Sequence, residues 1–225
     1  MMQSLTPEAT QLAEARVLFA EVGSAVVSDA VDEVAGRGAM DALEYRGPRG
    51  RAALGRALTV ALLPREDAQP TRFGGGVGGP LEAALTAAGP GDFLVFDLHG
   101  SRSAAVWGGL ASRFAVGRGV AGTVVWGCCR DVDEILEQGL PVWSLGSCPR
   151  RSRNDFVLAA IGEPVQVAGV SVSRDDLVFG DSTGVVVVPI ARLAEVVSVA
   201  RRIQHQESAL VAAIDRAGDV DWSLE

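Results

Sequence analysis

The sequence contains no lysine, and all 20 of its basic residues are arginine. An enzyme that forms a Schiff base with a carbonyl substrate needs a lysine amine, so the sequence excludes this route. A nucleotide-binding P-loop, whose lysine reaches the phosphates, is excluded for the same reason. Any carbonyl chemistry in this chain must therefore stabilise negative charge with arginine, backbone amides or a metal ion.

Other features are scarce as well. Three cysteines, two of them adjacent, make no disulfide framework and fit a reducing compartment. The two histidines, His99 and His205, lie in no zinc-binding spacing. With a net charge of −8 and no long basic run, we expect no binding to nucleic acid. We see neither a signal peptide nor an apolar run that would span a membrane, and we therefore expect a cytoplasmic protein.

The residues that are present indicate a folded α/β protein. Hydrophobic residues make up 48% of the 225 positions, enough for a substantial core. Valine-rich runs alternate with helical patterns, which predicts one α/β domain over residues 1–225. Strands are predicted at 57–63, 93–97, 122–126, 164–172 and 184–189. Helices are predicted at 6–21, 25–35, 81–88, 109–117, 131–138 and 190–214.

The last predicted helix carries an apolar stripe with an acid on it. The stripe consists of Leu193, Val197, Ala200, Ile203, Leu210 and Ile214. Glu207 lies four residues after Ile203 and three before Leu210, so it shares this face. Either it sits at the edge of the stripe and reaches water, or it delivers a carboxylate into a site, including one on a neighbouring subunit.

An arginine and an aspartate follow the predicted strand 122–126. In "VVWGCCRDVDEI", residues 124–135, Arg130 and Asp131 lie just past the strand, where ligands of α/β sheets collect. The planar fork of arginine matches a carboxylate, and aspartate offers the hard oxygen ligands that Mg²⁺ or Mn²⁺ prefers. Taken alone, these two residues also fit an ordinary ion pair at a strand–helix junction.

A second strand end points to the same place. We place the start of a helix at Gly108 and Gly109, after the strand 93–97. The backbone amides of Gly109, Leu110 and Ala111 would then be free donors at a helix N-terminus, which favours an anion. Together with Arg130 they predict a pocket for a small carboxylate, with a metal ion beside it on the neighbouring aspartate.

Two further features have simpler interpretations. Cys128 and Cys129 are predicted to be small packing residues rather than nucleophiles. The glycine-rich run at 74–79 is interpreted as a loop able to order over the site, in preference to an anion-binding nest.

The spacing of these residues resembles a known signature. Gly109, then twenty residues, then Arg130-Asp131, then two residues and Glu134, is similar to the signature of the RraA-like family. That family includes 4-hydroxy-4-methyl-2-oxoglutarate aldolases and regulators of ribonuclease activity. The segments 28–34, 55–60, 89–97, 118–127 and 180–189 resemble its other landmarks, so the resemblance extends from about residue 20 to about 215.

The resemblance implies a fold, an assembly and an activity. The fold would be a swivelling β/β/α-type domain, and the assembly a homotrimer or hexamer with helix 190–214 at a subunit interface. Aldolase members are class II enzymes that use Mg²⁺ or Mn²⁺. They cleave 4-hydroxy-2-oxo diacids into pyruvate and a second keto acid, and they decarboxylate oxaloacetate.

The resemblance also implies roles for individual residues. Arg130 would hold the carboxylate of the keto acid, helped by the start of the helix at 108–111. Asp131 would bind the metal directly. Glu207 of an adjacent subunit would reach the metal through water.

The chain departs from the family pattern where aldolases usually carry an acid after the first glycine of the helix start, because this position is Gly109. Trp126 likewise replaces an aspartate often found before Gly127. The alternative function is that of a non-catalytic regulator of a partner such as a ribonuclease. Such members tend to lack the aspartate after the arginine, and Asp131 therefore favours the enzyme.

Overall fold

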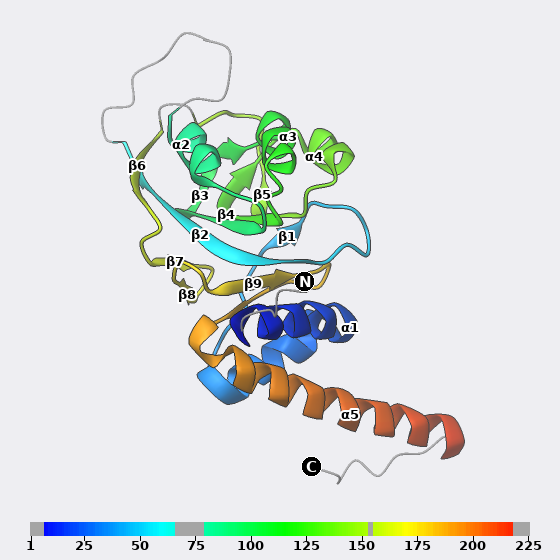
Figure 1. Ribbon diagram of the computed structural model, residues 1–225. Coiled ribbons are helices and arrows are strands. Elements are labelled where there is room, and N and C mark those ends of the chain that lie inside the picture. Colours follow the sequence, from blue (N-terminus) through cyan, green and yellow to red (C-terminus); the bar gives the residue numbers. More distant parts are fainter. Residues whose placement is uncertain (1–6, 66–78, 153–154, 218–225) are drawn as a thin grey trace, which may run out of the picture.

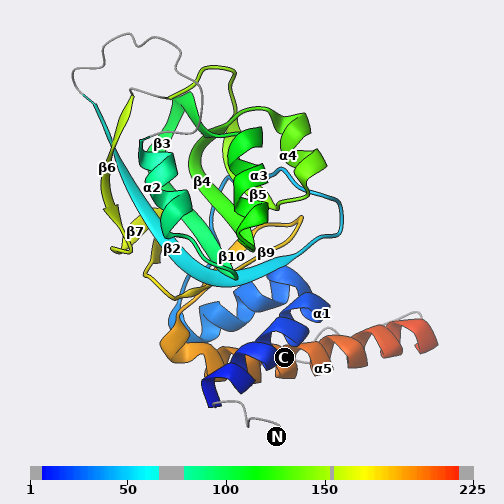
Figure 2. The ribbon, with the colours of Figure 1, turned by 45° about the horizontal axis from the view of Figure 1, so that its top comes forward.

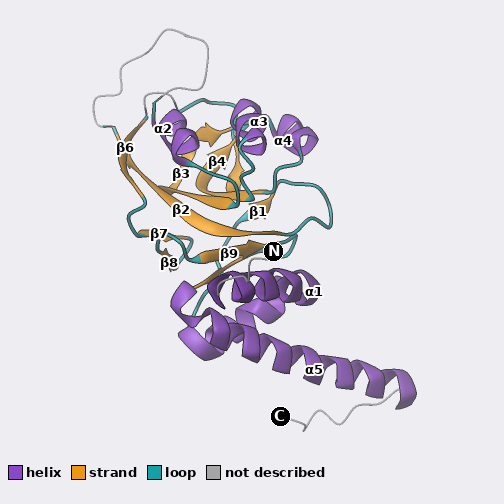
Figure 3. Cartoon of the chain, in the orientation of Figure 1, coloured by secondary structure: helices purple, strands orange, loops and turns teal. Residues whose placement is uncertain are grey.

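A computed structural model describes residues 7–65, 79–152 and 155–217, and a curled sheet runs through the middle of it (Figures 1 and 3). The strands follow one another across the sheet in the order β1-β5-β4-β3-β2-β9-β10, and β6 pairs with β2 beside this path. Their bounds are Glu44–Tyr45 (β1), Ala53–Pro64 (β2), Asp92–Trp107 (β3), Gly122–Cys129 (β4), Val142–Ser147 (β5), Phe156–Ile161 (β6), Leu177–Gly180 (β9) and Val185–Val188 (β10).

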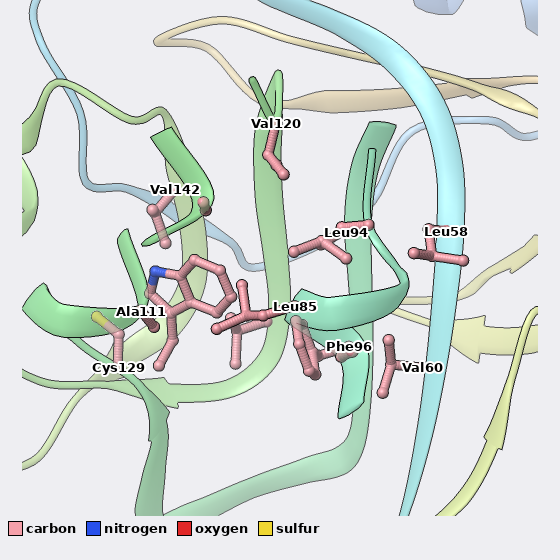
Figure 4. Packing of buried hydrophobic residues seen from close by; sticks show 14 of the residues in the cluster. Leu58, Val60, Leu85, Leu94, Phe96, Ala111, Val120, Cys129 and Val142 are labelled. Atoms are coloured by element: carbon pink, nitrogen blue, oxygen red, sulfur yellow. The ribbon is translucent and has the colours of Figure 1, made fainter. Parts of the chain in front are cut away.

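The central strands β2, β3, β4 and β5 are parallel, and three short helices cover one face of them (Figure 2). These helices are α2 (Pro80–Ala87), α3 (Gly109–Gly117) and α4 (Val132–Gln138). Their apolar sides and the sheet form one buried cluster, part of which Figure 4 shows. The strands are apolar almost throughout because both of their faces are buried.

The other side of the sheet carries two more clusters. The antiparallel strands β9 and β10 pack against the long helices α1 (Pro7–Ala35) and α5 (Leu193–Ala217), the latter preceded by the short helix η1 (Ile190–Arg192). The hairpin of β7 (Val165–Val167) and β8 (Val170–Val172) helps to fill the inside of the curl. Consequently α1 and α5 lie across the sheet from α3 and α4 (Figure 1).

The structure confirms the α/β pattern and changes several boundaries. Helix 109–117 is found as predicted, and 6–21 and 25–35 form α1, which kinks at Gly23. The predicted strand 164–172 is wrong, because a turn at Ala168 and Gly169, both with positive φ, folds it into the β7–β8 hairpin. The strands β1, β5, β6 and β9 were not predicted. No helix in the described ranges is both long and apolar enough to cross a membrane.

A single carboxylate fixes the kink in α1. Gly23 has a φ of 78°, which suits glycine, and the second half of α1 starts beside it. Asp181, in the turn between β9 and β10, accepts hydrogen bonds from the backbone N (2.8 Å) and Oγ (2.7 Å) of Ser24. It also accepts from the amides of Thr183 and Gly184 in its own turn. Asp181 thereby joins α1 to the far edge of the sheet.

We expect Asp181→Ala to lower the free energy of unfolding by about 2 kcal/mol, because several charge-assisted hydrogen bonds are lost. Burial raises the pKa of Asp181, but the bonds from Ser24, Thr183 and Gly184 outweigh it and leave the pKa below its ordinary value. The contribution is therefore complete above the unfolded-state pKa of about 3.9 and disappears as the pH falls through the lower folded-state pKa.

Urea unfolding at pH 7 and at pH 3 measures this effect. The neighbouring exposed Ser182→Ala is the control and should unfold like the wild type at both pH values. An equal loss of stability in the two variants would contradict the role of Asp181.

Candidate active site at the ends of strands β3 and β4

Arg130 and Asp131 lie where β4 passes into α4. The strand runs to Cys129, beyond the predicted end near Gly127, so Arg130 is the first residue after it. The backbone N of Arg130 donates to the carbonyl oxygen of Trp107 at 2.9 Å, which joins the end of β4 to the end of β3. Two strand ends and the helix starts that follow them therefore meet at one point.

Asp131 has an unusual backbone for a residue other than glycine. It occupies the N-cap position of α4, and its backbone lies in the left-handed region, with φ 52° and ψ 48°. Its side chain makes no capping hydrogen bond to that helix. This conformation costs about 1 kcal/mol, although aspartate tolerates it better than most residues. The turn directs the carboxylate of Asp131 toward the start of α3 instead of the start of its own helix.

The two charged side chains face each other beside α3. Arg130 Nε lies 3.3 Å from Asp131 Oδ2, and the side chains are 36% and 32% exposed. The backbone N of Gly109 donates a long hydrogen bond, 3.4 Å, to the same oxygen. The structure thus brings together Arg130, Asp131 and the helix start that the sequence analysis placed at Gly108 and Gly109.

Gly108 and Gly109 form a bare backbone surface on which two carboxylates rest; we call it the glycine cradle. A Cβ on Gly108 would lie 2.7 Å from Asp131 Oδ2. A Cβ on Gly109 would overlap Glu134 Oε2 and lie within 2.8 Å of two carbons of the same side chain. Gly108 has an extended backbone, so close approach rather than backbone conformation explains this glycine.

Glu134 is therefore an addition to the predicted site. The sequence analysis included it in the family signature but not among the site residues. The sequence feature that could have identified Glu134 is its position three residues after Asp131, because that spacing puts two side chains on the same side of a helix.

Donors for an anion lie next to the cradle. Leu110 and Ala111 are in the first turn of α3, and no described residue accepts a hydrogen bond from their amides. The helix start is held in place by Ser112, whose Oγ accepts from Trp107 Nε1 at 2.8 Å in the buried core. Free amides at a helix N-terminus, with a guanidinium nearby, suit a small carboxylate.

The acids of the cradle fit a hard, hydrated cation. The described residues contain no group of three or more His, Cys, Asp and Glu side chains that could hold a metal by themselves. Mg²⁺ commonly takes one or two protein carboxylates and keeps several waters, so Asp131 with Glu134 is a sufficient donor set. Zinc, which prefers nitrogen and sulfur ligands, does not fit these residues.

Within one chain, Glu207 lies far from this site. It is exposed on the distal half of α5, in a shallow groove shared with Glu21 and Val22 of α1. The predicted stripe on α5 is buried at its start, but Ile214 near its end is exposed. The distal half of α5 extends past the body of the molecule (Figure 1), so within one chain no part of the sheet covers that end of the stripe.

His99 was predicted to follow a strand end, but it lies in a bulged turn inside β3, where its φ is 52°. His99 is half-exposed, and its Nδ1 is 3.7 Å from Oδ2 of the buried Asp97. Asp97 also accepts a hydrogen bond from the His99 backbone N at 2.8 Å. Asp97 pairs in the sheet with Trp126, four residues before Arg130, so this turn is set back from the cradle. Of the glycine-rich run 74–79, all but Gly79 lies outside the described residues.

Comparison with known proteins identifies the family and agrees with the observed fold. The family described as RraA-like, Aldolase/RraA, matches residues 24–187. The chain belongs to the RraA-like family. Two solved structures share the fold: an uncharacterized protein of Pseudomonas syringae (TM-score 0.78, 28% identity, 95% of this chain and 96% of that one) and RraAS2 of Streptomyces coelicolor (TM-score 0.74, 29% identity, 85% and 93%). The second is described as an unusual member of the RNase ES inhibitor RraA protein family.

Curated relatives extend beyond the matched region. The protein DlpA of Legionella pneumophila is 29% identical over 202 residues, which are 90% of this chain and 32% of DlpA. A Halalkalibacterium halodurans protein, provisionally named a 4-hydroxy-4-methyl-2-oxoglutarate aldolase, is 30% identical over 131 residues. That match covers 58% of this chain and 62% of the relative. The chain thus spans less than two thirds of these relatives.

The cysteines beside the site of this RraA-like chain are packing residues. Cys128 and Cys129 are buried at the end of β4, and Cys129 Sγ lies 3.4 Å from Ser144 Oγ. Burial raises the pKa of both thiols, so they stay protonated and unreactive at neutral pH. Cys148, just after β5, is partly exposed.

We expect an aromatic disulfide reagent at pH 7.5 to modify one thiol of the native protein within minutes and all three after denaturation. Absorbance of the released thiolate counts them, and Cys148→Ser should remove the fast reaction. Fast modification that persists in this variant would show that Cys128 or Cys129 is reactive.

Proposed function

We propose that this protein is a divalent-metal-dependent class II aldolase. It cleaves 4-hydroxy-2-oxo diacids, such as 4-hydroxy-4-methyl-2-oxoglutarate, into pyruvate and a second keto acid, and it also decarboxylates oxaloacetate. The main support is the meeting of Arg130, Asp131 and the free amides of α3 at the glycine cradle. The provisional name of the Halalkalibacterium relative agrees with it.

Arg130 and α3 bind the keto acid by its carboxylate. Arg130 contacts Asp131 through Nε, and among the described residues its two terminal nitrogens have no other partner. They form a fork suited to a carboxylate, and the amides of Leu110 and Ala111 donate from the other side. This grip fixes the orientation of the bond that breaks, which lies two carbons from the carboxylate.

Both reactions pass through the same intermediate, the enolate of pyruvate, which becomes pyruvate when its methylene carbon takes up a proton. In the aldol cleavage the electrons of the broken carbon–carbon bond move onto the pyruvyl fragment, and in the decarboxylation they come from the departing CO₂. A divalent cation at Asp131 supplies several kcal/mol of stabilisation to the developing negative charge. Arg130 adds a positive charge beside it. In the aldol cleavage, a water molecule hydrogen-bonded to Arg130 accepts the proton of the substrate hydroxyl, since neither histidine lies in the site. In both reactions, water then delivers a proton to the enolate carbon, which gives pyruvate.

The complete site is built between subunits of a homotrimer or hexamer. The distal half of α5 exposes Val211 and Ile214, and on the opposite side of the sheet α3 and α4 expose Leu110, Phe114 and Leu136. Head-to-tail contact between these two surfaces would bury both, and such contacts close into rings. The same contact would bring Glu207 of one subunit toward Asp131 of the next.

We expect the protein to release pyruvate from oxaloacetate and from 4-hydroxy-4-methyl-2-oxoglutarate with Mg²⁺ or Mn²⁺ but not with a chelator. Asp131→Ala should abolish turnover, because the direct ligand is lost, while the exposed Asp133→Ala of the same helix keeps it. A coupled lactate dehydrogenase assay follows the pyruvate. Robust turnover in chelator would refute the metal dependence, and no turnover under any condition would favour a regulatory binding protein instead.

Glu207→Ala should lower turnover about 10–100-fold, as is typical for a residue that reaches a metal ion through a bound water instead of binding it directly. Light scattering should show an unchanged oligomer, and Gln206→Ala serves as the matched control. Mixing unfolded Asp131→Ala and Glu207→Ala chains and refolding them together should restore part of the activity, because some sites then receive both carboxylates. A monomer at micromolar concentration, or no recovery on mixing, would contradict a shared site.

A further inference from the structure

We propose that the hydrogen bond between the indole of Trp107 and Ser112 sets the position of the first turn of α3 relative to Arg130. Trp107 and Ser112 are therefore positioning residues, because both are completely buried and neither touches the substrate. The inference rests on the proposed function, since it concerns the grip on the carboxylate of the keto acid.

Trp107 is attached to both halves of this grip. It is the last residue of β3, and its carbonyl oxygen accepts the hydrogen bond from the backbone N of Arg130 at 2.9 Å. Its indole Nε1 donates to Ser112 Oγ at 2.8 Å inside the core. The ring of Phe96 packs against the indole, with 5.6 Å between the ring centroids. One well-packed residue thus joins the residue that carries the guanidinium to the helix that carries the free amides.

The first turn of α3 lacks the usual side-chain cap. Its N-cap is Gly108, which has no side chain to bond to the helix, and the turn holds no acid. A polar N-cap side chain would accept from the amide of Leu110 or Ala111, the second and third residues of the helix. Such a cap would occupy the donors that the keto acid needs. Ser112 orders the helix start from its buried side and leaves both amides free.

A simpler role for Ser112 is to give a buried indole N–H its hydrogen-bond acceptor. In that case the loss of the hydroxyl lowers the stability of the fold without changing the affinity for the substrate. Stability and substrate affinity, measured in the same variants, therefore distinguish the two roles.

The test is the steady-state kinetics of oxaloacetate decarboxylation by the full-length protein with Mg²⁺. We expect Ser112→Ala to raise KM about tenfold, the equivalent of one ordinary hydrogen bond, and to leave kcat within about twofold. A rise in KM alone is typical of binding that is lost equally in the ground state and the transition state. Ser112→Thr keeps the hydroxyl and should bring KM back close to that of the wild type.

Ala115→Gly is the control for stability, because Ala115 is buried on the same helix, three residues beyond Ser112. Glycine weakens a helix, so this variant should melt at a lower temperature and keep the KM of the wild type. Trp107→Phe removes the donor and should raise KM as Ser112→Ala does. The double variant should be no worse than either single one, because both changes remove the same bond.

The indole N–H of Trp107 also gives a signal in nitrogen–proton correlation NMR spectra, and Trp107→Phe identifies this signal by its loss. We expect pyruvate to shift the signal in the wild type, because the carboxylate binds the turn that the indole holds. In Ser112→Ala the same titration should leave the signal almost unmoved, since the indole no longer bonds to the helix.

An unchanged KM in Ser112→Ala would overturn the inference. An equal rise of KM in Ala115→Gly would also overturn it, because Ser112 would then act through stability alone. Turnover by the wild type would leave the proposed function standing in both cases. If the wild type turns over no oxaloacetate, the proposed function fails, and the pyruvate titration decides the inference: a shifted indole signal supports it and an unmoved one refutes it.

Discussion

The site depends on the close approach of α4 to the first turn of α3. The two helices start where neighbouring parallel strands end, and the bond from Arg130 N to Trp107 O holds those ends together. With two glycines at the start of α3, the carboxylates of α4 reach its backbone directly. A larger residue at either position would push the acids away from the amides and separate the proposed anion-binding and cation-binding halves of the site.

Much of this arrangement follows from local sequence. The glycine pair predicts a helix start, and the Arg-Asp pair after a valine-rich run predicts a strand end, so their meeting at one edge of the sheet needed only the parallel order of β3 and β4. The left-handed backbone of Asp131 could not be predicted in this way, because it depends on the turn between β4 and α4. The sequence alone therefore could not show that the carboxylate of Asp131 points toward α3.

The missed strands have a similar explanation. β9 is a four-residue strand and β1 a two-residue strand, and both gain their stability from pairing with distant segments rather than from their own pattern. β6 reads "FVLAAI", which is as consistent with a buried helix as with a strand, and only its antiparallel pairing with β2 decides between them. The stripe on α5 is a different case. Its helical period predicted the helix correctly, but the sequence could not show whether the chain itself or another copy covers each part of the stripe.

The distal half of α5 makes the stability of the folded state depend on the protein concentration. A lone chain leaves the apolar residues there exposed to water, and the apolar residues on α3 and α4 are exposed as well. Association, which removes both from water, would stabilise the folded state by mass action. Heat resistance would then rise with protein concentration. In the proposed assembly, dilution would weaken the fold and the proposed catalytic centre together, because α5 would serve both.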